Sequence, residues 1–187
     1  FINKKAEVMS MPAYDVCYLD SMIQKSRYLF KLIARNCEDV FGVIRDYMKG
    51  EYRERMDGGN PLYLNKTPKQ ILGSLGIRIR DEDGISEDYD EFILEWMADI
   101  YTYMQWKCNL PSMDIVGKIP PEELYLKYHP LHEASVENGV GKLREIYFRE
   151  DCVGRDGSIP DKDVKRMILE SYDLVTGKKN KVSERRE

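Results

Sequence analysis

Apolar side chains recur every three or four residues along most of the chain, which is the spacing of one face of an α-helix. The clearest run spans residues 88–107. Its apolar positions are Tyr89, Phe92, Ile93, Trp96, Met97, Ile100, Tyr101 and Met104. We predict that this segment forms a long central helix whose apolar face lies in the core.

Two more helices are expected ahead of the central one. The same spacing covers residues 14–34, and a second run begins at residue 36 or 37 and continues to residue 56. Gly58 and Gly59 follow, and glycine directly after a periodic run signals a helix end. We predict that these two helices form a hairpin.

Shorter helices are predicted from their starting signals. Thr67 is a capping residue, followed by proline at the first helical position and by Gln70 at the third, and this helix should end near residues 73–76. Residues 77–80 alternate like a brief strand, but an acidic turn follows at once, so no sheet is expected.

Three further helix starts follow the central helix. Ser112 can cap a short helix, two prolines at 120 and 121 open another, and Ser135 or Asn138 opens a third that runs to about residue 148. The chain should turn at Pro130. A last capped start at residues 158–161 leads to an amphipathic segment that stops at Gly177.

The predicted fold class is therefore all-α, an irregular multi-helix bundle around a central aromatic-rich helix, with a C-terminal helical appendage. We expect residues 1–13 to be disordered or tag-derived, residues 14–150 to form the helical domain, and residues 151–187 to form the C-terminal helix and basic tail. The most apolar stretch, residues 92–106, contains Glu95, Asp99 and Gln105, so no membrane-spanning helix is expected.

Composition narrows the class of protein further. The 187 residues are 42% hydrophobic and 33% charged, with a net charge of −4 and a mean hydropathy of −0.56, as in a folded protein that stays in water. A protein with this net negative charge has no general electrostatic attraction to nucleic acid. The four cysteines form no CxxC pair, which argues against a zinc or redox motif. We expect them to be reduced core thiols of a cytoplasmic protein, with disulfides as the alternative.

Candidate catalytic and metal-binding groups each have a simpler structural interpretation. His129 and His132 are the only histidines, and they flank a proline that breaks the helical spacing a shared metal would need. Acidic pairs lie at turns and helix starts, where they oppose helix dipoles. Residues 151–163 resemble part of a calcium-binding loop but lack two ligands. We predict no enzyme activity, no metal and no cofactor, although distant groups could still meet around the two histidines.

Residues 67–80 allow a different function. Their order resembles the first helix and turn of a helix-turn-helix, and DNA binding is the alternative hypothesis. The acidic residues 81–83 follow where a basic recognition helix is needed.

Aromatic residues are abundant, with 13 Tyr, 5 Phe and 2 Trp. They either complete the core or leave rings free for a partner, because Tyr and Trp are favoured at the centres of protein interfaces. The candidate partner-binding residues are Tyr101, Tyr103, Trp106, His129 and His132. A protein partner is expected, with membrane binding excluded.

The aromatic order also carries a resemblance to a known group of proteins. It rests on Trp96, Tyr101, Tyr103, Gln105, Trp106, Pro111, Ser112, Ile115, Leu124, Tyr128 and residues 131–135, together with residues 14–20 and 59–63. This pattern resembles small uncharacterised helical bacterial proteins whose genes often neighbour those of ADP-ribosyltransferase-like toxins. The resemblance implies a non-enzymatic protein-binding module of antitoxin or accessory type, whose partner is the product of a neighbouring gene and which acts by burying a partner surface.

Overall fold

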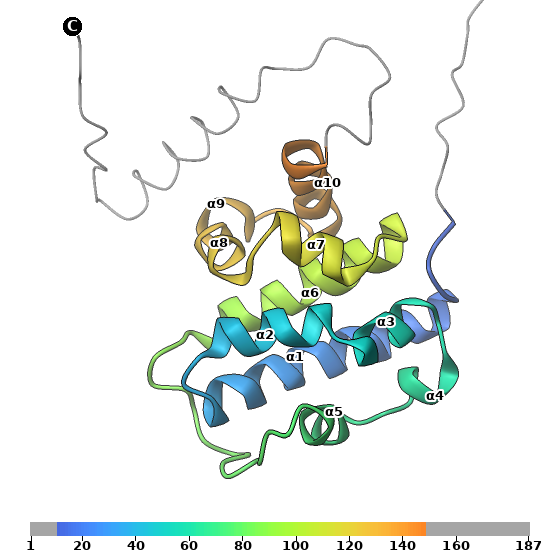
Figure 1. The fold of residues 1–187 in the computed structure, drawn as a ribbon. Helices are drawn as coiled ribbons and strands as arrows, with labels where there is room; N and C mark the ends of the chain where they lie inside the picture. Colours follow the sequence, from blue (N-terminus) through green and yellow to red (C-terminus); the bar gives the residue numbers. More distant parts are fainter. Residues whose placement is uncertain (1–10, 149–187) are drawn as a thin grey trace, which may run out of the picture. The chain divides into compact units, whose positions relative to one another are not determined.

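The computed structural model describes residues 11–148, and every regular element in that range is helical. The predicted all-α class is confirmed. Figure 1 shows the elements in order. They are the short 3₁₀ helix η1 (Val16–Tyr18) and the α-helices α1 (Leu19–Asn36), α2 (Val40–Lys49), α3 (Glu51–Asp57), α4 (Pro61–Leu64), α5 (Pro68–Ser74), α6 (Glu91–Cys108), α7 (Ser112–Lys118), α8 (Pro121–Leu126), α9 (Tyr128–Leu131) and α10 (Val136–Tyr147).

The core is built around two long helices, α1 and α6, which pack along each other (Figure 1). The prediction that residues 88–107 form the central helix is confirmed, and α6 begins where Asp90 accepts a hydrogen bond from the Phe92 backbone N–H. Helices α2 and α5 also contact α1, and α7 contacts α2 and α6. Most side chains of α6 are buried as a result.

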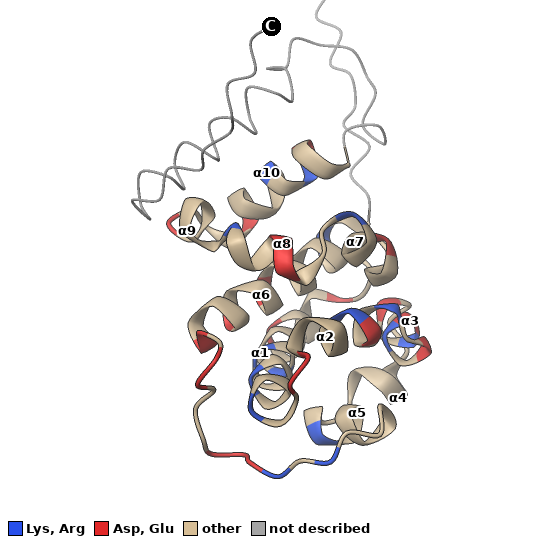
Figure 2. Ribbon diagram, turned by 60° about the vertical axis from the view of Figure 1, so that its left-hand side comes forward, with Lys and Arg blue, Asp and Glu red and all other residues tan. Residues whose placement is uncertain are grey.

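Ion pairs fix the register between α1 and α6. Three basic residues spaced by four on α1 meet three acidic residues spaced by four on α6, and Figure 2 shows these charges on the two helices. The pairs are Arg27–Asp99, Lys31–Glu95 and Arg35–Glu91, with N–O distances of 2.6, 2.6 and 2.7 Å. Because each step of four along one helix matches a step of four back along the other, the helices run antiparallel.

The sequence predicted a hairpin of two helices. The structure instead has the long helix α1 followed by two shorter helices, α2 and α3. Gly50, at which ψ is 154°, interrupts the run of residues 36–56 and separates α2 from α3. Its N–H donates to the Tyr47 carbonyl. The periodic spacing of apolar residues continues across Gly50, so periodicity could not reveal the break.

Two local details differ from the sequence prediction. Ser112 was expected to cap α7, but it is the first residue of that helix, and its hydroxyl bonds to Asp57 and Arg53 instead. Pro130 was expected to mark a turn, yet it lies within the short helix α9. Pro130 is the third residue of that helix, where its missing N–H has no intrahelical acceptor to lose.

The capping box at Thr67 is confirmed, with the Thr67 and Gln70 side chains each accepting from the other's backbone. After α5 the chain forms no strand at residues 77–80. Asn36 instead holds this segment against the end of α1, because its Oδ1 accepts from the N–H groups of Arg80 and Asp81 at 2.6 and 2.9 Å.

The chain separates into two compact units, the first ending at Tyr125 and the second beginning at Leu126. The sequence prediction had one domain over residues 14–150. It also excluded residues up to 13, whereas Ala13 donates a backbone hydrogen bond to Trp106. The predicted C-terminal helix and basic tail, residues 151–187, lie outside the described residues.

Among the described residues, no helix combines the length and apolar character needed to span a bilayer. Cys17 and Cys37 carry free thiols. Cys17 is exposed rather than part of the core.

Candidate binding sites on the helical unit

The three predicted partner-binding residues of α6 lie in different surroundings. Tyr101 is 1% exposed, and its hydroxyl donates to the Ile119 carbonyl at 2.7 Å. Tyr101 therefore completes the core and offers no surface in this fold. Trp106 is 8% exposed and Tyr103 is half-buried, with their ring centroids 5.7 Å apart.

A short N-terminal segment, residues 11–15, covers Trp106, and we call it the strap. The Ala13 N–H donates to the Trp106 carbonyl at 3.0 Å, and the Trp106 indole N–H donates to the Tyr14 carbonyl at 2.8 Å. Of the residues predicted to bind a partner at the end of α6, Trp106 is thus already bound by the chain itself.

The glycine after α3 makes room for the strap. Gly59 has a φ of +70°, and a Cβ built there would lie 3.3 Å from the Tyr14 Cβ and 3.5 Å from the Ala13 carbonyl oxygen. Both the left-handed backbone and the close approach favour glycine at this position. We call Arg53, Gly59 and Trp106 the strap seat.

A buried arginine lies beneath the strap. Arg53 is 1% exposed, and its Nε donates to the Asp57 carboxylate at 2.9 Å and to the Ser112 hydroxyl at 2.7 Å. Its Nη1 donates to the Tyr47 hydroxyl at 3.1 Å. A buried guanidinium requires such partners, because an unpaired charge in the interior is very costly.

The neighbouring groups also set the acid–base behaviour of this cluster. Burial alone lowers the pKa of Arg53, but the combined effect of Tyr47 and Asp57 outweighs it and raises the pKa, so the guanidinium stays charged. Burial raises the pKa of the Tyr14 phenol to about 12, with Arg53 lowering it and Asp57 raising it to smaller extents. Both members of the buried ion pair, Arg53 and Asp57, therefore affect the pKa of the Tyr14 phenol.

Several buried polar atoms in and near this cluster have no hydrogen-bond partner among the described residues. They are the Tyr14 and Tyr52 hydroxyls, Arg53 Nη2 and Gln105 Oε1. Each such atom costs about 1–3 kcal/mol when it is removed from water without a partner. Most buried polar atoms in proteins have a hydrogen-bond partner, so these four atoms are exceptions.

The two histidines belong to the second unit and lie on its surface. His132 stacks on the Tyr128 ring with centroids 4.6 Å apart, and its Nδ1 lies 2.9 Å from the His129 carbonyl oxygen. Since a carbonyl can only accept, this contact is a hydrogen bond in the tautomer that carries the proton on Nδ1. Within residues 11–148, no group of three or more His, Cys, Asp or Glu is arranged to hold a metal.

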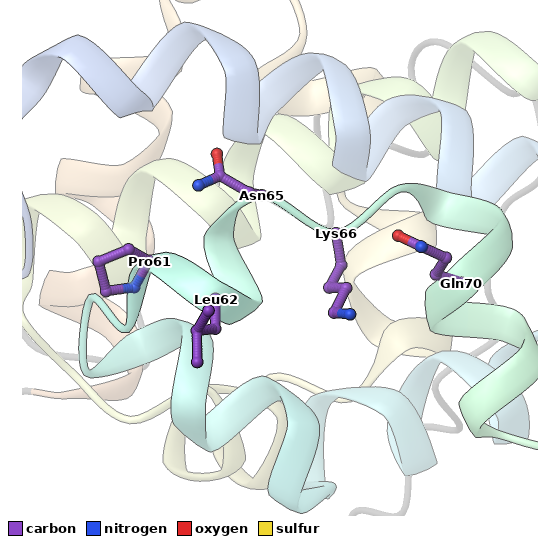
Figure 3. A pocket seen from close by; sticks show the side chains of 5 residues that line it. All are labelled: Pro61, Leu62, Asn65, Lys66 and Gln70. Carbon is purple, nitrogen blue, oxygen red and sulfur yellow. The ribbon is translucent and has the colours of Figure 1, made fainter.

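An open pocket of about 280 Å³ lies between α4 and α5. Figure 3 shows the side chains that line it, which are Pro61, Leu62, Asn65, Lys66 and Gln70. The pocket contains no carboxylate, histidine or thiol among these residues. Its chemistry is that of a shallow surface depression with one basic side chain.

The helix-turn-helix interpretation depended on a second helix after α5. Residues 75–80 contain no helix, and the next one, α6, begins only at Glu91. The two-helix unit on which the DNA-binding hypothesis rested is not formed within residues 67–80.

An aromatic surface that the sequence did not reveal lies before and at the start of α6. Phe41, Tyr89 and Tyr125 are all half-buried and meet edge to face, with centroids 5.2 to 6.2 Å apart. The Tyr125 hydroxyl accepts from the Asp90 backbone N–H at 3.1 Å. These three residues are called the aromatic surface below.

Phe92, three residues after Tyr89 in the chain, is 76% exposed. The apolar periodicity of residues 88–107 predicts Phe92 in the buried face, and that expectation was wrong. Phe92 lies in the first turn of α6, where Arg35 in the last turn of α1 is already paired with Glu91. Periodicity assigns a face of the helix to a residue but does not show whether another element covers that face in the first turn.

Comparison with known proteins provides no further information on these sites. No protein-family model, curated protein or solved structure matches the chain.

Proposed function

We propose that the chain is a non-enzymatic protein-binding module of antitoxin or accessory type, as the sequence resemblance implies. It acts by covering a surface of the product of a neighbouring gene. The observation that carries this proposal is Phe92, a large apolar side chain 76% exposed on the central helix. Aromatic residues in such a position are favoured at the centres of protein interfaces.

Three further aromatic rings near the start of α6 support a docking role. The half-buried rings of Phe41, Tyr89 and Tyr125 adjoin the start of α6 and are held in place by their mutual edge contacts. Aromatic side chains that are already ordered lose little conformational entropy when a partner covers them. An ordered apolar surface is therefore suited to binding.

Co-expression with the neighbouring gene product, followed by size-exclusion chromatography, tests the proposal. We expect the two proteins to elute together at an earlier volume than either alone. Separate elution of both proteins at micromolar concentration would contradict the proposed function. It would mean that the complex has less than about 8 kcal/mol of binding free energy, the value for a micromolar Kd.

A further inference from the structure

The strap seat has the features of a peptide-binding site that the chain fills itself. Residues 13 and 14 make one donated and one accepted hydrogen bond with Trp106, and the Tyr14 side chain is directed among Arg53, Asp57 and Tyr47 closely enough for all three to affect its pKa. The strap has no regular secondary structure. It is therefore held by a few specific contacts rather than by a helix ladder.

We infer that the strap seat is a binding site for a short peptide segment carrying an aromatic side chain, and that the strap occupies it in cis through Tyr14. A partner segment of the same chemistry takes the seat when the strap leaves. This goes beyond the proposed function, because it concerns the opposite end of α6 from Phe92 and rests on different residues.

The unpartnered atoms explain why the strap can leave. The Tyr14 hydroxyl and Arg53 Nη2 are buried without a hydrogen-bond partner among the described residues. Opening returns both groups to water, which offsets part of the loss of the contacts between the strap and Trp106. Such a segment opens at lower free energy than the core it covers.

The contacts of the strap also define what the seat recognises. The residue before the tyrosine must supply a backbone N–H for the Trp106 carbonyl, so proline is excluded at that position. The residue at the tyrosine position must supply its carbonyl for the indole N–H, and its Cβ must fit beside Gly59. A ligand therefore contains an aromatic residue that follows a residue other than proline.

A strap peptide supplied in trans tests the inference. The probe is a fluorescent synthetic peptide of residues 11–18 with Cys17→Ser, titrated against the full chain and against the strap-release variant Ala13→Pro/Tyr14→Ala. The variant loses the N–H and the ring that fill the seat. We expect the wild type to bind the peptide about tenfold or more weakly than the variant, because its seat is mostly occupied.

A second peptide, with Tyr14→Ala, is the matched control and should not bind either protein. Equal binding of the probe to wild type and variant, or no binding to a folded variant, would overturn the inference. Circular dichroism establishes whether the variant is folded.

A measurement on the wild type keeps the inference testable if the variant does not fold. Hydrogen exchange should show the Ala13 amide and the Trp106 indole N–H opening more readily than the amides of Leu29 and Ile33 in α1. Equal protection of all four groups would mean that the strap opens only with global unfolding, and that the seat is ordinary core.

Discussion

Gly59 and Gly76 share a left-handed backbone but differ in what surrounds them. Their φ angles are +70° and +73°, yet a Cβ at Gly59 would meet the strap while one at Gly76 would meet nothing within 4 Å. We predict that Gly76→Ala lowers the free energy of unfolding by about 1–2 kcal/mol, the cost of a left-handed alanine. Gly59→Ala should cost more, because the methyl group also crowds Tyr14.

Urea unfolding of the two variants measures this difference. Gly76→Ala is the matched control, since it carries the same backbone strain without the contact. Equal losses of stability in the two variants would show that a methyl group at residue 59 does not crowd the strap.

Tyr14 makes stability depend on pH in the alkaline range. Burial raises its pKa from 10.0 to about 12, so the folded chain retains a proton that the unfolded chain releases. The resulting stabilisation is complete below pH 10.0 and is lost as the pH rises through about 12. Over that window the free energy of unfolding of Tyr14→Phe should fall less steeply than that of the wild type, as urea titrations at a series of pH values will show. Parallel profiles would contradict this assignment.

Some residue-scale features could not be predicted from the sequence. Arginine is almost always exposed, so nothing in residues 51–57 indicates that Arg53 is buried. Ser112 precedes a helix and carries a good capping group, but Asp57 and Arg53 recruit its hydroxyl. Both outcomes depend on residues distant in the chain.

At the scale of elements, the ion pairs between α1 and α6 provide a test of register. Lys31 and Glu95 are both about three-quarters buried and lie 2.6 Å apart. We predict that Lys31→Glu destabilises the chain by about 0.5–1 kcal/mol, and that adding Glu95→Lys recovers most of the loss. A double-mutant cycle in urea measures the coupling.

The exposed pair Glu51–Arg55 on α3 is the control for this cycle. Its side chains are 75% and 54% exposed, so solvent and salt screen the interaction and the coupling should be close to zero. Coupling of equal size in both pairs would indicate that α1 and α6 are not held in register by their charges.

Elements with strong local signals were predicted well. The capping box at Thr67 and the apolar period of α6 each involve residues of a single segment. The local sequence alone is therefore enough to predict these two helices. The break at Gly50 and the short helices α4 and α9 were missed because periodicity cannot resolve segments of one turn. The basic and acidic residues spaced by four on α1 and α6 were a usable signal for their pairing.

At the scale of the whole molecule, the candidate sites were only partly foreseen. The sequence identified Trp106 and Tyr103 from their residue types, and the structure adds the strap that covers Trp106. The sequence analysis placed Phe92 in the buried face, whereas its side chain is 76% exposed. Whether His129 and His132 bind a partner stays a prediction, and both lie on the surface of the second unit.

The most direct test of a protein-binding role is calorimetric titration of the neighbouring gene product into wild type, Phe92→Ser and Leu62→Ser. Leu62 is the matched control, because it is 74% exposed on α4, away from the aromatic surface. We predict that the wild type and Leu62→Ser bind alike and that Phe92→Ser binds about tenfold or more weakly. Absence of binding by the wild type, or equal weakening in the two variants, would contradict the proposal.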